Sequence, residues 1–442
     1  MDKEKTHTSP GPDGLPTRLF STKALRPIFA KLFADMANFI TKYGQLPDCF
    51  IDLFIRILGK PGKDLVDIKN YRPIALMQIC LRIICKGPTN RLLRVLHLLI
   101  DHQQLAYIPG RRIDHASFLL QQFLVDALKE ASEVCIMDSD IMKAFDSLDH
   151  VYIECTLVAQ RIHPNMIKMV MTIITSLMAK VCVNDQDTKS FKIGWGIPQG
   201  ASSISAIIFI LCFNPLISLA LNHEMIAPGV TLGLSLNLQQ AGSTDLLKTS
   251  MLKNLPSDLF LSQLHPSKPL SDDPDSIKAD PQIEKPNLPP SNIPELALPV
   301  VHCIIYADDH KALCKTWEMA AWWIYFYDIF KPISGLARST EKTVLHLLGK
   351  SFWTQDPSQG DILVPTRKAL DTIASIKSHP ALSSLKIEIG ADFKNCGLIF
   401  SIQDLANDEE YCSTALTKKT WEKGAKCISS FQIVIHILYY II

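Results

Sequence analysis

The sequence predicts a mixed fold of helices and short buried strands. Apolar residues at i, i+3 and i+4 spacing predict a helix over residues 22–43. Two apolar runs, at residues 134–137 and 300–306, have the length of buried strands. Aspartates follow both runs, so polar groups are expected where these strands end.

Further elements follow from local patterns along the chain. A cluster of Pro and Gly at residues 9–14 is typical of a turn, the loosely alternating run at 50–58 indicates a strand, and residues 60–64 form another turn cluster. No internal repeat is evident. Additional helices are predicted over residues 76–99, 116–131, 163–178 and 202–221.

Composition excludes some protein classes, and the distribution of charge adds a positive indication. A length of 442 residues with 47% hydrophobic residues allows a large core and excludes a wholly disordered chain. The net charge of +1 would ordinarily argue against a nucleic-acid binder, but residues 1–112 hold 18 Lys and Arg against 9 Asp and Glu. This asymmetry suits an enzyme that binds phosphates with one part and metal ions with another. The alternative is a solvated basic surface.

Three further features concern linkers and location. Residues 256–299 hold ten of the 27 prolines, which predicts a flexible insertion or linker. The 12 cysteines include no Cys-x-x-Cys pair, and the N-terminus has no apolar stretch typical of a secretory signal. We therefore expect free thiols in an intracellular protein of the cytoplasm or nucleus. The apolar run at 428–442 is short for a membrane span and favours a truncated end over an anchor.

Two aspartate motifs carry the strongest chemical signal. Asp308 and Asp309 follow an apolar run, and a divalent cation would relieve the repulsion between adjacent carboxylates. Hard oxygen ligands select Mg²⁺ or Mn²⁺ over zinc. If Asp140 points the same way from a neighbouring strand, the three carboxylates form a two-metal site for phosphoryl transfer. The alternatives are a simple Asp-Asp turn and a helix cap at Asp140.

A third motif, Gly-Trp-Gly-Ile-Pro-Gln-Gly-Ala-Ser-Ser at residues 194–203, would read as a turn if it stood alone. It follows Asp-x-x-Lys-Ala-Phe-Asp at 140–146 and precedes Tyr-Ala-Asp-Asp at 306–309. This ordered set resembles a reverse transcriptase domain of a non-LTR (LINE-like) retrotransposon. Flanking segments resemble further motifs of that family: residues 11–14, 46–47, 60–63, 70–74 and 108–111 in the fingers, 334–336 with 341–343 in the palm, and 396–399 beside the primer grip.

The resemblance implies an α+β fold shaped like a right hand, with helical fingers, an antiparallel-sheet palm and a partial thumb. Residues 1–125 would form the fingers. Residues 126–240 would form the first part of the palm with fingers elements, and 241–299 the Pro-rich flexible insertion. Residues 300–375 would complete the palm, and 376–442 would form a primer-grip-like hairpin and a truncated thumb.

The resemblance also implies residue roles. Asp140, Asp308 and Asp309 would be catalytic and would bind Mg²⁺ or Mn²⁺, with Tyr306 beside the primer end. Phe145 would act as a steric gate against the ribose 2′-OH, and Lys342 would protonate the leaving pyrophosphate. The implied nucleotide-binding residues are Lys60, Arg72, Phe145, Gln199, Gly200 and Lys342.

The implied activity is RNA-directed DNA synthesis, the addition of dNTPs to a primer 3′-OH. The partners would be an RNA template, a DNA primer and dNTPs, with no membrane and no obligate protein partner. The sequence departs from the family at Gly59, at residues 203–209 and at His310, a polar residue expected to disturb strand packing. These departures, with no room for an endonuclease or RNase H domain, leave a catalytically inactive remnant that only binds nucleic acid as the alternative. A group II intron maturase-like protein is disfavoured because no basic region follows the expected thumb.

Overall fold

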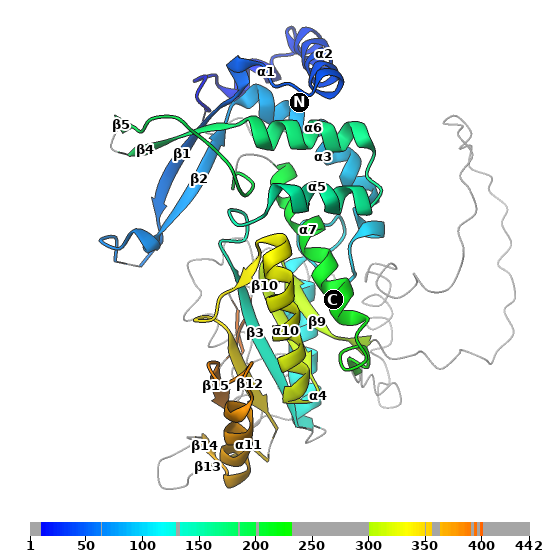
Figure 1. The fold of residues 1–442 in the computed structure, drawn as a ribbon, viewed down its shortest axis with the longest axis vertical. Coiled ribbons are helices and arrows are strands. Elements are labelled where there is room, and N and C mark those ends of the chain that lie inside the picture. The colour runs from blue at the N-terminus through cyan, green and yellow to red at the C-terminus, as the bar shows by residue number, and fades with distance from the viewer. Residues whose placement is uncertain are drawn as a thin grey trace, which may run out of the picture.

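The computed structural model describes residues 10–62, 64–129, 133–183, 186–199, 203–231, 300–349, 351–355, 363–389, 393–395 and 398–400. They form an α+β fold with two main sheets. Figure 1 shows one sheet with most of the helices in the upper half and the other sheet in the lower half. The predicted Pro-rich insertion, residues 256–299, and the apolar run at 428–442 lie outside the described residues.

The upper region is built on a long hairpin. Strand β1 (Asp52–Gly59) pairs antiparallel with β2 (Tyr71–Met77) and parallel with β4 (Met178–Val183). The short strands β5 (Gln186–Asp187) and β6 (Phe191–Lys192) also pair with β4. The hairpin of β1 and β2 extends away from the helices (Figure 1). Around it lie α1 (Thr17–Ser21), α2 (Arg26–Tyr43), α3 (Ile79–Leu99), α5 (His150–Ala159), α6 (Pro164–Ser176) and the one-turn helices η1 (Asp48–Phe50) and η2 (Ile68–Asn70).

The lower region is a sheet with the strand order β15-β12-β3-β10-β9, and β11 pairs with the far end of β3. Its central strand is β3, whose first four residues are buried apolar side chains. The strands on either side of β3 come from segments far apart in the sequence, and together they form one sheet. The strands are β3 (Val134–Met142), β9 (Cys303–Tyr306), β10 (Asp309–Cys314), β11 (Ala337–Arg338), β12 (Val344–Leu348) and β15 (Lys386–Ile389).

Helices join the two regions and cover the lower sheet. Helix α10 (Trp317–Ser334) packs on β3 and β10, and α4 (Ile113–Lys129) packs on β9. Helix α7 (Ser203–Leu221) contacts α3 and α5 above and α10 below, so it lies between the regions. By length and composition α7 could cross a membrane, but 72% of its most apolar stretch is buried inside the protein, as in a core helix.

Smaller elements close the described chain. Strands β7 (Val230–Thr231) and β8 (Val300–Val301) pair antiparallel, so the chain before residue 232 and the chain after residue 299 lie side by side. Two hairpins, β13 (Trp353–Gln355) with β14 (Leu363–Pro365) and β16 (Phe393–Asn395) with β17 (Leu398–Phe400), flank α11 (Arg367–Ser378) and β15. The second of these is the hairpin that the sequence places near residues 396–399.

Most predicted elements are confirmed, and two expectations are wrong. The predictions over residues 22–43, 50–58, 116–131, 163–178 and 202–221 match α2, β1, α4, α6 and α7. The helix expected from residue 76 begins at Ile79, because the preceding residues form β2 and pair with β1. Strand β3 does not end before Asp138; it continues to Met142. Helix α11 spans residue 375, and β15 beyond it pairs with β12 of the lower sheet.

Candidate active site

The register of two neighbouring strands brings three aspartates to one end of the lower sheet. Strands β3 and β10 are antiparallel, and Asp140 lies directly across from Asp309. Tyr306 lies across from Asp309 on β9, and only Ala307 and Asp308 separate the two strands. Asp308 therefore sits at the tip of a two-residue turn beside Asp140 and Asp309.

The surroundings of Asp308 disfavour its charged form. Burial raises the pKa of the Asp308 carboxyl, and the nearby carboxylates of Asp140 and Asp309 raise it further. Lys342 acts in the opposite direction and lowers this pKa. Carboxylates crowded in this way gain most from a cation placed among them.

Lysines neutralise two of the carboxylates in this arrangement. Lys342 donates to Asp140, and its side chain is 69% exposed. Lys311 on β10 is only 1% exposed, and its Nζ lies 2.7 Å from Asp138 Oδ1 and 3.0 Å from Asp309 Oδ1. Asp309 is thus bound to a buried lysine, whereas Asp140 is bound to an exposed lysine.

The donor set fits a divalent cation by its chemistry. Across the residues that the structure describes, no three His, Cys, Asp or Glu side chains are gathered closely enough to enclose a metal ion. Asp140 and Asp308 nevertheless supply hard carboxylate oxygens that influence one another, which is the ligand type that Mg²⁺ and Mn²⁺ prefer. An ion at Asp140 would have to displace Lys342, which its exposed, flexible side chain permits.

The Gly-rich loop after β6 is fixed to the turn that follows Asp140. The backbone N–H of Gly196 donates to Leu148 O and that of Ile197 donates to Phe145 O, both at 2.8 Å. Gly196 has a φ of +79°, and a Cβ there would lie 2.6 Å from the backbone oxygen of Asp146. Only glycine allows this close approach.

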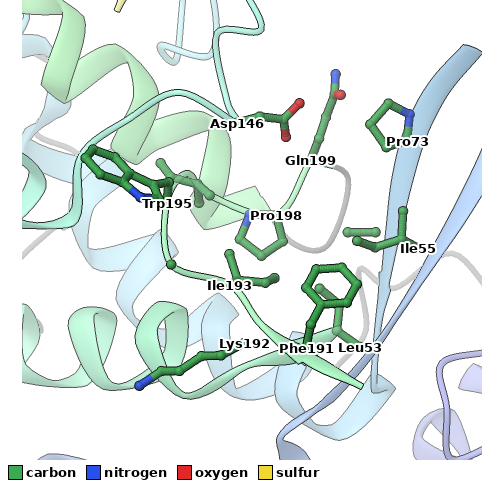
Figure 2. Close-up of a pocket in the computed structure, with 13 residues that line it drawn as sticks. Leu53, Ile55, Pro73, Asp146, Phe191, Lys192, Ile193, Trp195, Pro198 and Gln199 are labelled. Atoms are coloured by element: carbon green, nitrogen blue, oxygen red, sulfur yellow. The ribbon is translucent and has the colours of Figure 1, made fainter. Parts of the chain in front are cut away.

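The same loop also contacts the upper hairpin and lines a cavity. The N–H of Ala75 on β2 donates to Gln199 O at 2.8 Å. A cavity of about 220 Å³ lies between this loop and strands β1 and β2. Figure 2 shows Gln199, Asp146 and Pro73 around it, with the apolar side chains of the loop and of β1 on the other side.

The other residues expected at the site are spread over three places. The Phe145 ring packs against Phe209 of α7, with ring centroids 5.1 Å apart. Arg72 is exposed on β2, and Lys60 Nζ donates to Lys69 O of the same hairpin at 2.7 Å. These two basic side chains therefore belong to the upper hairpin and not to the aspartate cluster. Gly200 lies outside the described residues.

His310 does not disturb the strand, contrary to expectation. Its side chain is fully buried, and Nδ1 lies 2.7 Å from the Tyr327 hydroxyl of α10. Burial lowers the pKa of this imidazole to about 3, so it is neutral at physiological pH. The polar residue is accommodated by a hydrogen bond to a neighbouring helix.

Sequence patterns did not identify three residues that contact the site. Asp138 precedes Asp140 by two residues, so the two-residue period of a strand could have placed both on one face. Lys311 likewise follows Asp309 by two residues on β10. Gln104 bonds the backbone of Ala307, a residue 203 positions away, and no local pattern could have indicated this contact.

Comparison with known proteins identifies a related family for part of the chain. Residues 58–233 match the family model "Reverse transcriptase (RNA-dependent DNA polymerase)". The chain is 31% identical over 213 residues to the "Transposon TX1 uncharacterized 149 kDa protein" of Xenopus laevis, covering 48% of this chain and 16% of that protein. It is 24% identical over 203 residues to the "Retrovirus-related Pol polyprotein from type-1 retrotransposable element R2" of Nasonia vitripennis, covering 46% of this chain and 19% of that protein. The chain thus spans less than a fifth of these relatives.

Two structures of telomerase from Candida tropicalis align with part of this chain. The apo enzyme truncated from its C-terminal domain aligns with a TM-score of 0.39 at 12% identity, covering 76% of this chain and 60% of that one. A second telomerase structure, in complex with a fragment of telomeric RNA, aligns with a TM-score of 0.39 at 13% identity, over 75% of this chain and 46% of that one. The family match over residues 58–233 and the two relatives lead to one conclusion: this chain contains a reverse transcriptase domain of the non-LTR retrotransposon type, and its described residues form an α+β fold.

Proposed function

We propose that this chain is the catalytic core of an RNA-directed DNA polymerase that adds dNTPs to a primer 3′-OH. The observation that carries the proposal is the convergence of Asp140, Asp308 and Asp309 at one end of the sheet. The match of residues 58–233 to the reverse transcriptase family supports the same reaction.

In this proposal Asp140 and Asp308 hold two Mg²⁺ or Mn²⁺ ions, and Asp309 supports them from its pairing with Lys311. Bound ions would lower the pKa of the primer hydroxyl and neutralise the charge on the leaving pyrophosphate. With an ion held at Asp140, the exposed Lys342 ammonium would be displaced from that carboxylate and could donate a proton to the pyrophosphate. Tyr306, half-buried on β9, supports the primer end.

The remaining residues select and hold the nucleotide in this proposal. Phe145 disfavours a 2′-OH on the sugar, and its packing on Phe209 keeps the ring in place. Arg72 and Lys60 bind the triphosphate when the hairpin of β1 and β2 approaches the palm, since arginine suits bidentate phosphate contacts. Gln199, with Gly200 beside it, lines the pocket for the nucleotide and the template.

The proposed partners are an RNA template, a DNA primer and dNTPs. The excess of Lys and Arg in residues 1–112 supports phosphate binding that weakens as salt rises. We propose the fingers, palm and primer-grip ranges stated above as the domain organisation, with β15 assigned to the palm. We also propose an intracellular location, which nine free cysteines among the described residues support.

Primer extension on a primed RNA template tests the proposal. We expect Mg²⁺-dependent incorporation by the wild-type chain, reduced at least about 10²-fold in Asp308→Asn and Asp140→Asn because each removes a metal ligand. Asp371→Asn, an exposed aspartate on α11, is the matched control and should incorporate like the wild type. Incorporation that survives Asp308→Asn would contradict the proposed site.

The second candidate function is a nucleic-acid-binding remnant without catalysis. Its support is the pairing of Lys342 with Asp140 and of Lys311 with Asp309, which leaves two carboxylates already neutralised. Template binding in a filter assay, with no incorporation under any Mg²⁺ or Mn²⁺ concentration, would favour this function over the polymerase.

A further inference from the structure

We propose that Gln104 is a positioning residue for the aspartate-bearing turn, which it holds through both backbone groups of Ala307. Gln104 is completely buried, in the segment between α3 and α4. Its Oε1 accepts the N–H of Ala307 at 3.1 Å, and its Nε2 donates to Ala307 O at 3.2 Å. One amide side chain therefore hydrogen-bonds both the N–H and the carbonyl oxygen of the residue directly before Asp308. The inference deepens the proposed polymerase function and rests on it for its kinetic consequences.

The turn needs such support because its backbone conformation is strained. Ala307 has a φ of +60°, in the left-handed region that L-residues other than glycine rarely occupy. It is the first of two residues between Tyr306 and Asp309, a position at which glycine is the favoured residue when φ is positive. Asp308 follows at once, so any relaxation of the Ala307 peptide would turn the Asp308 carboxylate away from Asp140.

The partners of Gln104 fix the orientation of its amide. Oε1 also accepts the N–H of Ala106 at 3.0 Å, so this atom faces two donors and Nε2 faces one acceptor. A carboxylate at this position would keep the acceptor but would place a charge against Ala307 O and close to Asp308. Gln104→Glu is therefore no conservative change in this geometry.

The segment that carries Gln104 is itself held rigidly to the sheet. Leu105 N–H donates to Ile305 O at 2.8 Å, and Ile305 N–H donates to Gln103 O at 3.1 Å, so the segment runs alongside β9. Arg111 Nη1 donates to Gln104 O at 2.7 Å and to Asp101 O at 2.6 Å. Since the support is anchored at several points, it can oppose strain in the turn.

Gln103 provides a matched control for the test. It is the adjacent residue, of the same type and also buried. Its Oε1 accepts the N–H groups of His302 and Cys303 at 2.8 Å and 2.6 Å, at the opposite end of β9 from Asp308. Loss of Gln103 should therefore weaken the sheet without releasing the Ala307 peptide.

The kinetic test compares Gln104→Met with the double variant Gln104→Met/Ala307→Gly. Methionine keeps the length of the side chain and removes all three hydrogen bonds. We expect kcat for single-nucleotide incorporation to fall by about 10²-fold in Gln104→Met, with the KM for dNTP little changed, because the reacting groups are misaligned. Glycine removes the strain at φ +60°, so the double variant should recover about 10-fold of kcat. The same Ala307→Gly change should not rescue Gln103→Met.

Amide hydrogen exchange tests the contact without catalysis. We expect the peptide covering residues 303–310 to exchange faster in Gln104→Met than in the wild type, and the change to centre on Ala307. If the wild-type chain incorporates no nucleotide, the polymerase proposal fails while this measurement still tests the hold on the turn. Unchanged exchange in Gln104→Met overturns the inference. A kcat of Gln104→Met equal to that of the wild type also overturns it, as does a folded Gln104→Met/Ala307→Gly variant whose kcat is no higher than that of Gln104→Met.

Discussion

At the scale of single residues, a buried lysine neutralises the carboxylates beneath the site. Lys311 is 1% exposed, whereas its partners Asp138 and Asp309 are 27% and 37% exposed. The two carboxylates hold the pKa of the Lys311 ammonium above its usual value, although burial opposes them. Burial raises the pKa of Asp138, and Lys311 limits that rise. The three side chains therefore act as one unit, and the loss of the lysine leaves two carboxylates facing each other.

We predict that Lys311→Met destabilises the protein by up to about 3 kcal/mol, less than for a fully buried pair because both carboxylates retain contact with water. The urea midpoint of unfolding measures this change. Lys368→Met, which breaks an exposed pair with Glu133, should shift stability by no more than about 1 kcal/mol. The double variant Lys311→Met/Asp138→Leu should recover part of the loss. Equal midpoints for Lys311→Met and Lys368→Met would show that the buried lysine contributes nothing.

At the residue scale, the sequence allowed the expectation that Asp140 lies near Asp308 and Asp309, and strand register produces that placement. The roles of these residues stay a prediction. Asp140, Asp308 and Asp309 come together because β10 pairs antiparallel with both β3 and β9. Gln104 was beyond sequence reasoning because it acts through a chain segment distant from the turn. Lys311 was also missed, since a lysine next to an Asp pair is typical of an exposed charge unless the neighbouring strand is known.

At the scale of elements, the loop at residues 194–199 depends on one glycine. Gly196 stacks against the backbone of Asp146, and its carbonyl lies 2.8 Å from His150 Nε2. The loop in turn anchors β2 through Gln199 O. It therefore connects the strand turn after Asp140 to the upper hairpin.

We predict that Gly196→Ala destabilises the protein by more than about 1 kcal/mol, because alanine meets both an unfavourable φ and the Asp146 backbone. Gly194→Ala, two residues away in the same loop, has open space around its Cβ and should be neutral. Urea unfolding of the two variants, followed by nucleotide incorporation, compares them directly. A Gly196→Ala variant as stable and active as Gly194→Ala would mean that the loop can shift without cost.

Helix prediction was more reliable than strand prediction at this scale. The helix α2 ends where expected because Gly44 adopts the left-handed conformation, with φ +65°, that terminates many helices. Strand β2 was missed because apolar residues lie on both sides of Gln78, in the end of β2 and the start of α3, and its pairing with β1 separates the two elements. Strand β3 was cut short because Asp138 and Asp140 look like a strand end, whereas Lys311 on β10 and Lys342 in the turn before β12 pair with them inside the sheet.

At the scale of the whole molecule, the charge asymmetry follows the division into two regions. The basic residues up to 112 belong mainly to α1, α2, α3 and the hairpin of β1 and β2, which form the upper region. The aspartate cluster lies in the lower sheet. The net charge of +1 is therefore the sum of a basic region suited to binding phosphates and a region whose carboxylates are suited to binding cations.

We predict that residues 232–299 can be replaced by an Asn-Gly turn without loss of the fold. Thr231 and Val300 are register partners, so a two-residue connection suits the ends that β7 and β8 present. A shorter connection also lowers the entropy cost of closing the loop, by about 0.6 kcal/mol for each halving of its length. Thermal melting should give an unchanged or higher midpoint. A shortened chain that fails to fold would show that the segment supplies part of the core.

The central claim is that Asp140 and Asp308 together hold the catalytic ions. Electron paramagnetic resonance of Mn²⁺, titrated into the chain with a primed RNA template and a non-hydrolysable dNTP, measures this most directly. We expect two bound ions for the wild type and for Asp371→Asn, and loss of at least one in Asp140→Asn and in Asp308→Asn. Equal Mn²⁺ binding by the wild type and both site variants would contradict it.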